Sequence, residues 1–377
     1  MKKLLLLLSM ILFVLLQTGC SDSQITEKAS GSAESISLTA ATKEASKVAQ
    51  WPKEEWSVSS PEEQGIDSAM LTKADERIIE NYPNIYSFLV VRNGFLIYEK
   101  YYEGMNKDSF NPVYSITKSV TSALTGIAIK ENILQDTNQK VSELIPDYFA
   151  SIDDEKKKEI TLENVLTMTG GLESIDSDYF KFFSSPDWLE FALKKPLIDA
   201  PGEKFVYNTG LTQLLSGVIT EKAKMSTKEF AEKYLFGPLH INIRRWDCDT
   251  KNCYGGGSGL YLTPQDMAEF GYLYLNKGKW DGNQIIPEEW VTESTTAHIN
   301  REPDSDYGYL FWIYKTTNPV TGKSYDTYSA EGAGGQKIIV IPDLELIVVI
   351  TADMNKTSLD KADNKLLVEN FVLPGLK

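Results

Sequence analysis

Ser115 and Lys118 stand three positions apart, with the residue types and spacing of a nucleophile and its activating base. Residues 115–131 have helical periodicity and Pro112 lies just upstream, so we expect Ser115 at or near a helix N-terminus. The free N–H groups and the positive dipole end there favour negative charge on the serine oxygen. Lys118 lies one turn further, within reach, and can take the serine proton if its surroundings lower its pKa toward neutrality. The pair predicts covalent catalysis through a serine.

The same spacing recurs at Ser358 and Lys361, where the serine would open a polar terminal helix and cap it. Capping is therefore the structural alternative for Ser115 as well. Context separates the two copies, because small residues follow Ser115 and let its helix lie deep inside a domain. These residues are Ser119, Ala123 and Gly126.

Tyr207 could complete the proton path. It lies in a turn-rich loop, residues 201–210, that precedes an apolar stretch. A tyrosine beside the serine and lysine can act as phenolate or pass the serine proton to the leaving group. A buried tyrosine bonded to a loop carbonyl explains the residue equally well.

A glycine-rich segment, residues 331–336, leads into a late strand. Glycine at the start of a strand lets another backbone or a substrate approach closely. If this strand lies beside Ser115, the backbone amides of Ser115 and Gln336 could form an oxyanion hole. An ordinary glycine-rich turn is the alternative.

Other chemistries fit the chain less well. A serine hydrolase with a histidine base needs a suitable histidine, and the only two are His240 in a turn and His298 in a polar stretch. Ser115 also lacks a surrounding Gly-x-Ser-x-Gly sequence. We expect no metal site, because zinc requires four ligands and the histidines are far apart in sequence, and nothing calls for a cofactor. The net charge of −15 argues against nucleic acid as a partner.

The first twenty residues have the features of a bacterial export signal. Lys2 and Lys3 precede an apolar run at residues 4–16, which is too short to span a bilayer, and the segment ends at Cys20. This ending resembles a lipobox, whose cysteine becomes lipidated, although Gln17 replaces the usual leucine. Plain secretion with an incidental Cys20 is the alternative. We expect a signal peptide (1–20) and a protein anchored by lipid to the membrane of the cell envelope.

Residues 21–50 are rich in small and charged residues and contain no aromatic residue, which predicts a flexible tether. A globular domain is expected over residues 51–377. Within it, Cys248 and Cys253 flank four residues, and the sequence leaves open whether they form a disulfide or remain thiols.

Apolar patterns predict strands at both ends of this domain and helices between them. The expected elements are a helix (68–82), two early strands (85–91 and 95–101), late strands (309–314, 326–329, 337–341 and 344–351) and a final helix (359–371). Asn93-Gly94, typical of tight hairpins, joins the early strands. We expect an α/β (α+β) fold with an antiparallel five-stranded sheet built from both chain ends and flanked by helices. A mainly helical subdomain, about residues 110–300, is inserted.

Three motifs stand in the order and at the separations found in the serine β-lactamase and D-alanyl-D-alanine carboxypeptidase superfamily, which the chain resembles over about residues 55–375. They are Ser115-x-x-Lys118, Tyr207-Asn208-Thr209 and Ala333-Gly334-Gly335. The class C-like esterase branch, which includes 6-aminohexanoate-dimer (nylon-oligomer) hydrolases, is the closer match. The supporting stretches are residues 89–94, 160–169 and 257–263.

The resemblance implies a β-lactamase/transpeptidase-like fold and an acyl-enzyme on Ser115. It also implies that Lys118 and Tyr207 share proton transfer as general base and acid, and that the Gln336 amide completes the oxyanion hole. The further substrate-binding residues that it implies are Asn208, Gly334 and Gly335.

Two departures from the family pattern bear on the substrate. The second motif commonly ends in Asn, where this chain has Thr209, and the third commonly begins with a cation, where it has Ala333. That cation attracts the carboxylate of penicillins and peptide C-termini, and Lys337 is no obvious replacement. We therefore expect hydrolysis of an ester or amide in a small or peptide-like, less anionic substrate, with weak or no β-lactamase activity. A non-catalytic lipoprotein that binds peptidoglycan or a partner protein on the same fold is the alternative.

Overall fold

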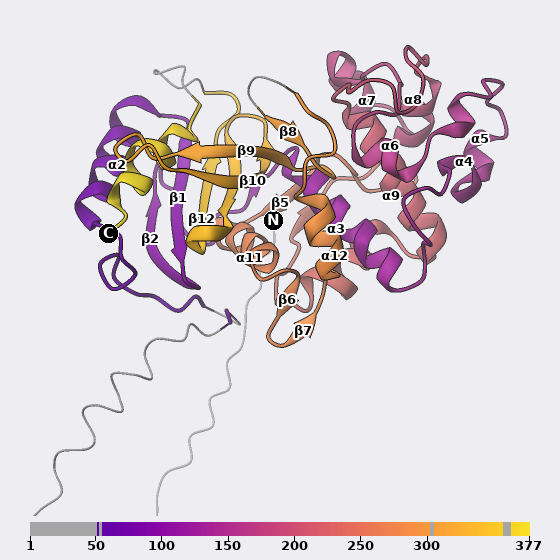
Figure 1. Cartoon of the computed structure of the whole chain (residues 1–377). Coiled ribbons are helices and arrows are strands. Elements are labelled where there is room, and N and C mark those ends of the chain that lie inside the picture. The colour runs from indigo at the N-terminus through magenta and orange to yellow at the C-terminus, as the bar shows by residue number, and fades with distance from the viewer. Residues whose placement is uncertain (1–50, 53–54, 302–304, 357–362) are drawn as a thin grey trace, which may run out of the picture. The chain divides into compact units, whose positions relative to one another are not determined.

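A seven-stranded antiparallel sheet forms one side of the structure (Figure 1), with the order β2-β1-β12-β11-β10-β9-β8. Its strands are β1 (Ile85–Arg92), β2 (Phe95–Tyr101), β8 (Asp306–Tyr307), β9 (Trp312–Thr317), β10 (Ser324–Gly332), β11 (Gln336–Ile341) and β12 (Leu346–Ala352). The computed structural model describes residues 51–52, 55–301, 305–356 and 363–377. The expected signal peptide (1–20) and tether (21–50) lie outside these residues. Both ends of the domain contribute to one sheet, as the sequence predicts.

The expected count of five strands is wrong, because the sheet has seven in the described residues. β8 contains two residues, too few to show an alternating pattern in the sequence. The strand expected at 309–314 instead begins at Trp312, because Leu310 has a left-handed backbone (φ 64°) that breaks an extended chain. The α/β class and the antiparallel arrangement are confirmed.

Helices cover both faces of the sheet because its central strands are apolar on both sides. In β1, Phe88 and Val90 face one layer, and Leu89 and Val91 face the other. The first face packs on α2 (Ser68–Asn81) and on the C-terminal turns η6 (Val368–Val372) and η7 (Leu373–Gly375). The second face packs on α11 (Pro264–Leu275) and α3 (Ile116–Lys130).

A mainly helical region lies beside the sheet (Figure 1). Its members are α4 (Val141–Leu144), α5 (Pro146–Phe149), η2 (Lys157–Glu159), α6 (Leu162–Leu166), η3 (Asp176–Asp178), α7 (Tyr179–Phe183), α8 (Trp188–Lys194), α9 (Thr209–Ala223), α10 (Thr227–Ala231) and η4 (Glu232–Phe236). Within this region α9 packs against α4, α6, α8 and α10. A small sheet, β3 (Asn111–Pro112), β5 (Leu260–Leu262) and β4 (Arg245–Trp246), pairs the chain before α3 with the chain after η4. The remaining elements are β6 (Lys279–Trp280), β7 (Asn283–Gln284), α12 (Glu288–Ser294) and η5 (Pro342–Leu344). No helix in the described ranges is long and apolar enough to span a membrane.

Helix α3 lies in the interior, between the sheet, α9 and α12. Every residue from Ile116 to Ala128 is buried. The small residues that follow Ser115 permit this burial, because a Cβ at Gly126 would lie 2.3 Å from the ring of Trp290. The small-residue pattern thus predicts correctly that this helix lies deep in the domain.

Of the final helix expected at 359–371, residues 359–362 lie outside the described residues. Residues 363–365 are not helical, and the π-helical turn η6 spans Val368–Val372. The buried Asn364 side chain instead donates to the Gly335 carbonyl at 2.7 Å and ties this segment to the β10–β11 turn. The second serine–lysine copy, Ser358 and Lys361, lies outside the described residues.

Cys248 and Cys253 are free thiols. An aspartate closes the short loop between them, because Asp249 Oδ1 accepts from the amides of Lys251 and Cys253, both at 2.9 Å. The Cys253 sulfur is buried and accepts from Gln213 at 3.2 Å. The loop therefore holds its shape without a covalent crosslink.

Candidate active site

Ser115 is the N-cap residue of α3, but its side chain makes no capping hydrogen bond. The preceding residue, Tyr114, has a left-handed backbone (φ 49°), which is uncommon for a bulky side chain and marks a sharp turn into the helix. The Ser115 hydroxyl is thereby left for another partner. Lys118 Nζ lies 2.9 Å from Ser115 Oγ, so the structure brings the predicted pair together.

Lys118 is buried, with 1% of its surface exposed. Its amine makes three contacts of 2.9 Å, with Ser115 Oγ, Thr209 Oγ1 and the carbonyl oxygen of Gly257. Removal from water penalises the charged amine and lowers the pKa of Lys118 to about 7, although the Asp176 carboxylate acts in the opposite direction. A large fraction of this lysine is therefore neutral near pH 7.

Asp176 fixes the direction of the Thr209 hydroxyl. Thr209 Oγ1 donates to Asp176 Oδ1 at 2.6 Å, and the Thr209 amide donates to Oδ2 at 3.1 Å. An ionised carboxylate only accepts, so the Thr209 proton is committed to Asp176 and its oxygen can only accept from Lys118. The carbonyl of Gly257 also only accepts. A neutral Lys118 must give its two N–H groups to these oxygens, which directs its lone pair toward Ser115 Oγ.

Tyr207 lies beside this pair. Lys118 Nζ is 4.8 Å from the centre of the Tyr207 ring, and the ring stacks on Trp312 at 5.9 Å. Burial raises the pKa of the Tyr207 hydroxyl well above its ordinary value, and a hydrogen bond with Ser115 opposes this rise. The side chain is therefore a neutral phenol near pH 7, which favours proton relay over the phenolate role.

Asn208 lies next to the site, but its side chain has a structural task. Its Oδ1 accepts from the amides of Gly210 and Leu211 as the N-cap of α9, and its Nδ2 donates to the carbonyl of Leu172. These contacts hold Tyr207 and Thr209, on either side of it, in place. Asn208, which the resemblance implied as a substrate-binding residue, thus holds the backbone of the site through these hydrogen bonds.

The glycine-rich segment reaches the site through Gly332, the last residue of β10. A Cβ at Gly332 would lie 2.3 Å from the carbonyl oxygen of Val113, two residues before Ser115. At the expected binding residues, a Cβ on Gly334 would lie 2.5 Å from Met354, and a Cβ on Gly335 would lie 2.6 Å from the side chain of Asn364. The side chain of Gln336 is buried and bonded to the backbone of Ala352.

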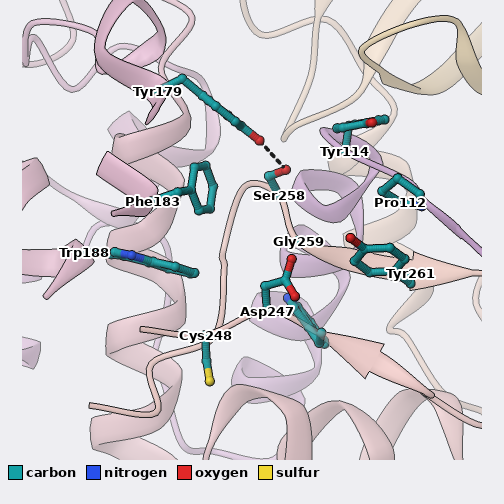
Figure 2. Close-up of a pocket in the computed structure, with 11 residues that line it drawn as sticks. Pro112, Tyr114, Tyr179, Phe183, Trp188, Asp247, Cys248, Ser258, Gly259 and Tyr261 are labelled. Carbon is teal, nitrogen blue, oxygen red and sulfur yellow. Dashed lines mark hydrogen bonds between the residues drawn. The ribbon is translucent and has the colours of Figure 1, made fainter. Parts of the chain in front are cut away.

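A cavity of about 570 Å³ adjoins the site (Figure 2). Tyr114, the residue before Ser115, and Ser258, the residue after Gly257, both line it. The Tyr179 hydroxyl lies 2.9 Å from Ser258 Oγ and links α7 to this wall. The serine–lysine pair therefore stands next to a space that can hold part of a substrate.

Sequence reasoning missed Asp176 and the Gly257 carbonyl, and it treated Thr209 only as a departure from the motif. The signals available for Gly257 were the glycine-rich run at residues 255–259 and the family-like stretch 257–263, which begins at Gly257. A Cβ at Gly257 would lie 2.2 Å from Thr212 Oγ1 and 3.0 Å from the carbonyl oxygen of Thr209, so α9 leaves room only for glycine where the Gly257 carbonyl reaches Lys118. The described residues include no group of three or more His, Cys, Asp or Glu side chains that could hold a metal ion.

Comparisons with known proteins bear on the family and the fold. The family model named Beta-lactamase matches residues 85–370. The 6-aminohexanoate-dimer hydrolase of Paenarthrobacter ureafaciens is 23% identical over 281 residues, which are 70% of this chain and 71% of that protein. The solved structure of EstCE1, a hydrolase with promiscuous acyltransferase activity, has a TM-score of 0.67 at 15% identity, covering 81% of this chain and 97% of that one. A D-stereospecific amidohydrolase from Streptomyces sp. has a TM-score of 0.63 at 16% identity, covering 80% and 97%.

These similarities confirm the family resemblance drawn from the three motifs. The family model covers most of the folded chain, from β1 to η6. The chain belongs to the β-lactamase family and is a serine hydrolase.

Proposed function

We propose that this protein hydrolyses an ester or amide bond through an acyl-enzyme on Ser115. The observation that carries the proposal is the 2.9 Å contact between Ser115 Oγ and a buried lysine whose pKa is lowered to about 7. A serine hydroxyl is a weak nucleophile until a neighbouring base removes its proton. Lys118 has both the position and the protonation state for that task.

In the first step, neutral Lys118 accepts the Ser115 proton while Oγ bonds to the substrate carbonyl carbon. The resulting tetrahedral intermediate collapses when its bond to the leaving oxygen or nitrogen breaks. Lys118, with Tyr207 as relay, returns the proton to that leaving atom. Water then attacks the acyl-enzyme with the same groups in reverse, releasing the acid and restoring Ser115.

Developing negative charge on the carbonyl oxygen needs backbone N–H donors. We propose the Ser115 amide, at the N-terminus of α3, and an amide of the β10–β11 turn, which ends at Gln336. The close approach of Gly332 to the Val113 carbonyl supports a position for this turn beside Ser115.

We also propose that carboxylate-bearing β-lactams are poor substrates. Ala333 supplies no cation, and Lys337 is already engaged, because its amine lies 2.6 Å from Glu331 and 3.3 Å from Asp363. A lysine that is 5% exposed between two carboxylates is not free to attract an anionic substrate. Weak or absent β-lactamase activity follows.

For location, we propose export and lipid attachment at Cys20 in the bacterial cell envelope. The charged start, the short apolar run and the lipobox-like ending support this proposal. Metabolic labelling with an alkyne fatty acid tests it, because Cys20→Ala should abolish incorporation and release the protein from membranes.

A fluorophosphonate probe tests the nucleophile. We expect the purified domain to be labelled, Ser115→Ala to lose both labelling and ester turnover, and Ser358→Ala, the matched control from the second serine–lysine copy, to retain both. Labelling that persists in Ser115→Ala would place the nucleophile elsewhere.

A further inference from the structure

The cavity beside Ser115 has an aromatic lining. Six of its eleven lining residues are aromatic, and they come from three separate parts of the chain. These are Tyr114, Tyr179, Phe183, Trp188, Trp246 and Tyr261. In Figure 2 the rings of Tyr179, Phe183 and Trp188 stand on one wall and those of Tyr114 and Tyr261 on the opposite wall. Rings arranged on two sides can hold a flat apolar group between them.

Some of the lining side chains pack on one another and leave a stable wall. Phe183 contacts Tyr179 and Trp188 with ring centres 4.5 and 4.8 Å apart. Trp188 and Trp246 are almost fully buried, at 3% and 5% exposed. Tyr179 is 38% exposed and lies at the rim, so it can contact a substrate without supporting the core.

The lining of the cavity carries one charged side chain, a carboxylate. Its lining includes Asp247 and no lysine, arginine or histidine. Arg245 pairs with Asp247 Oδ1 at 2.8 Å, its side chain is exposed, and its guanidinium lies 4.3 Å from the centre of the Tyr261 ring. Burial, and after it the carboxylates of Asp176 and Asp247, raise the pKa of Tyr179, so two carboxylates act on this wall. An anionic substituent would meet the Asp247 carboxylate here, and the cation near it, Arg245, is already paired with that carboxylate.

We infer that this cavity binds a bulky, uncharged aromatic group on one side of the scissile bond, and that it selects against substrates carrying a carboxylate there. The inference rests on the proposed hydrolysis at Ser115, and it names the substrate class of that reaction. The link between Tyr179 and Ser258, which follows the Gly257 carbonyl bound by Lys118, places the aromatic wall beside the reacting groups.

Two ester series test the inference by pH-stat titration at pH 8. In one series the alcohol is always methanol, and the acyl group is butanoyl, 3-phenylpropanoyl, 3-(2-naphthyl)propanoyl or the anionic glutaryl monoester. In the other the acyl group is always acetyl, and the alcohol is butyl, benzyl or 2-naphthylmethyl. We expect kcat/KM to rise at least tenfold from the alkyl to the naphthyl member in one series, which identifies the side that enters the cavity. If the acyl side enters the cavity, the glutaryl monoester should be the slowest methyl ester.

Variants assign the preference to the cavity. Tyr179→Ala should lower the ratio of kcat/KM for the naphthyl ester to kcat/KM for the butyl or butanoyl ester by about fivefold, the value of one aromatic contact. Tyr148→Ala, which removes a tyrosine lining a different cavity, is the matched control and should change neither. Asp247→Asn should raise kcat/KM for the glutaryl monoester by about tenfold without helping the neutral esters.

The outcomes separate the two proposals. If fluorophosphonate labels Ser115 but aryl and alkyl esters react equally, the aromatic-pocket inference is wrong and the hydrolase proposal stands. An unchanged aryl preference in Tyr179→Ala, with an unchanged glutaryl rate in Asp247→Asn, would place the selecting surface elsewhere. If Ser115 is not labelled and no ester is cleaved, the hydrolase proposal itself fails.

Discussion

Replacing Asp176 by Asn should change both the rate and the pH dependence of the enzyme. The Asp176 carboxylate accepts twice from Thr209, and Asn has only one acceptor oxygen. In Asp176→Asn the new NH₂ group must face either the Thr209 amide or its hydroxyl. The Thr209 proton is then no longer committed away from Lys118, and the lysine lone pair loses its fixed direction toward Ser115.

The expected changes in kcat/KM and in the pKa of Lys118 can be worked out from two hydrogen bonds and one charge. A hydrogen bond to a charged group contributes about 2 kcal/mol, so loss of this orientation should lower the plateau of kcat/KM about 30-fold. The Lys118–Thr209 and Thr209–Asp176 contacts, at 2.9 and 2.6 Å, hold the two charges within about 5.5 Å. With an effective dielectric constant of about 40, suited to an exposed carboxylate, removal of that charge lowers the free energy of lysine deprotonation by about 1.5 kcal/mol.

Loss of the Asp176 charge should make the enzyme active at lower pH, even though it lowers the maximum of kcat/KM. Asp176 raises the pKa of Lys118, which burial has lowered to about 7. Without the carboxylate, Lys118 stays neutral at lower pH, and the acid limb of kcat/KM should move from about pH 7 to about pH 6. Less activity at the plateau and a more acidic limb should therefore occur together.

The assay is kcat/KM for an ester between pH 5 and 9, with thermal unfolding recorded at each pH. Asp178→Asn is the matched control, because Asp178 lies in the same η3 turn but bonds Lys181 and Lys195 instead of Thr209. It should leave the limb near pH 7. A limb that stays at pH 7 in Asp176→Asn, whatever its plateau, would refute the coupling through Thr209.

Further predictions concern stability and the thiols. Burial, with a contribution from Asp266, raises the pKa of Glu269 to about 9, so the folded state holds a proton that the unfolded state releases near pH 4.3. The contribution of Glu269 to the free energy of unfolding is fully present below about pH 4 and declines as the pH rises to about 9. In differential scanning calorimetry, Glu269→Gln should therefore melt a few degrees above wild type at pH 8 and at the same temperature as wild type at pH 4. Burial raises the pKa of the Cys253 thiol to about 12, so iodoacetamide at pH 8 should modify Cys248 in the folded protein and both cysteines only in denaturant. A requirement for reductant before either cysteine reacts in denaturant would contradict the free thiols.

Local signals in the sequence predicted the elements that carry Ser115 and Lys118. Asn93-Gly94 predicted the early hairpin, and the small residues after Ser115 predicted a deeply buried helix. The serine–lysine contact followed because both residues lie within one helical turn. Neighbours fixed by the local backbone are readable from spacing alone.

Residues that reach the site from distant parts of the chain could not be predicted from local spacing. Asp176 reaches Thr209 from 33 positions away, and Gly257 reaches Lys118 from 139. Neither separation has a local periodicity that could reveal it. The third motif shows the same limit, because a Cβ at each of the three glycines in residues 331–336 would meet a different neighbour: Val113 at Gly332, Met354 at Gly334 and Asn364 at Gly335.

The central claim is that neutral Lys118 activates Ser115, and the pH dependence of Ser115 labelling tests it most directly. The second-order rate of fluorophosphonate labelling, followed by intact-mass spectrometry from pH 5 to 9, should rise with pH, level off above an apparent pKa of about 7 and fall about tenfold per pH unit below it. Lys118→Met should be labelled at least a hundredfold more slowly while remaining folded. A rate that is flat from pH 5 to 9, or a Lys118→Met variant labelled as fast as wild type, would contradict the account.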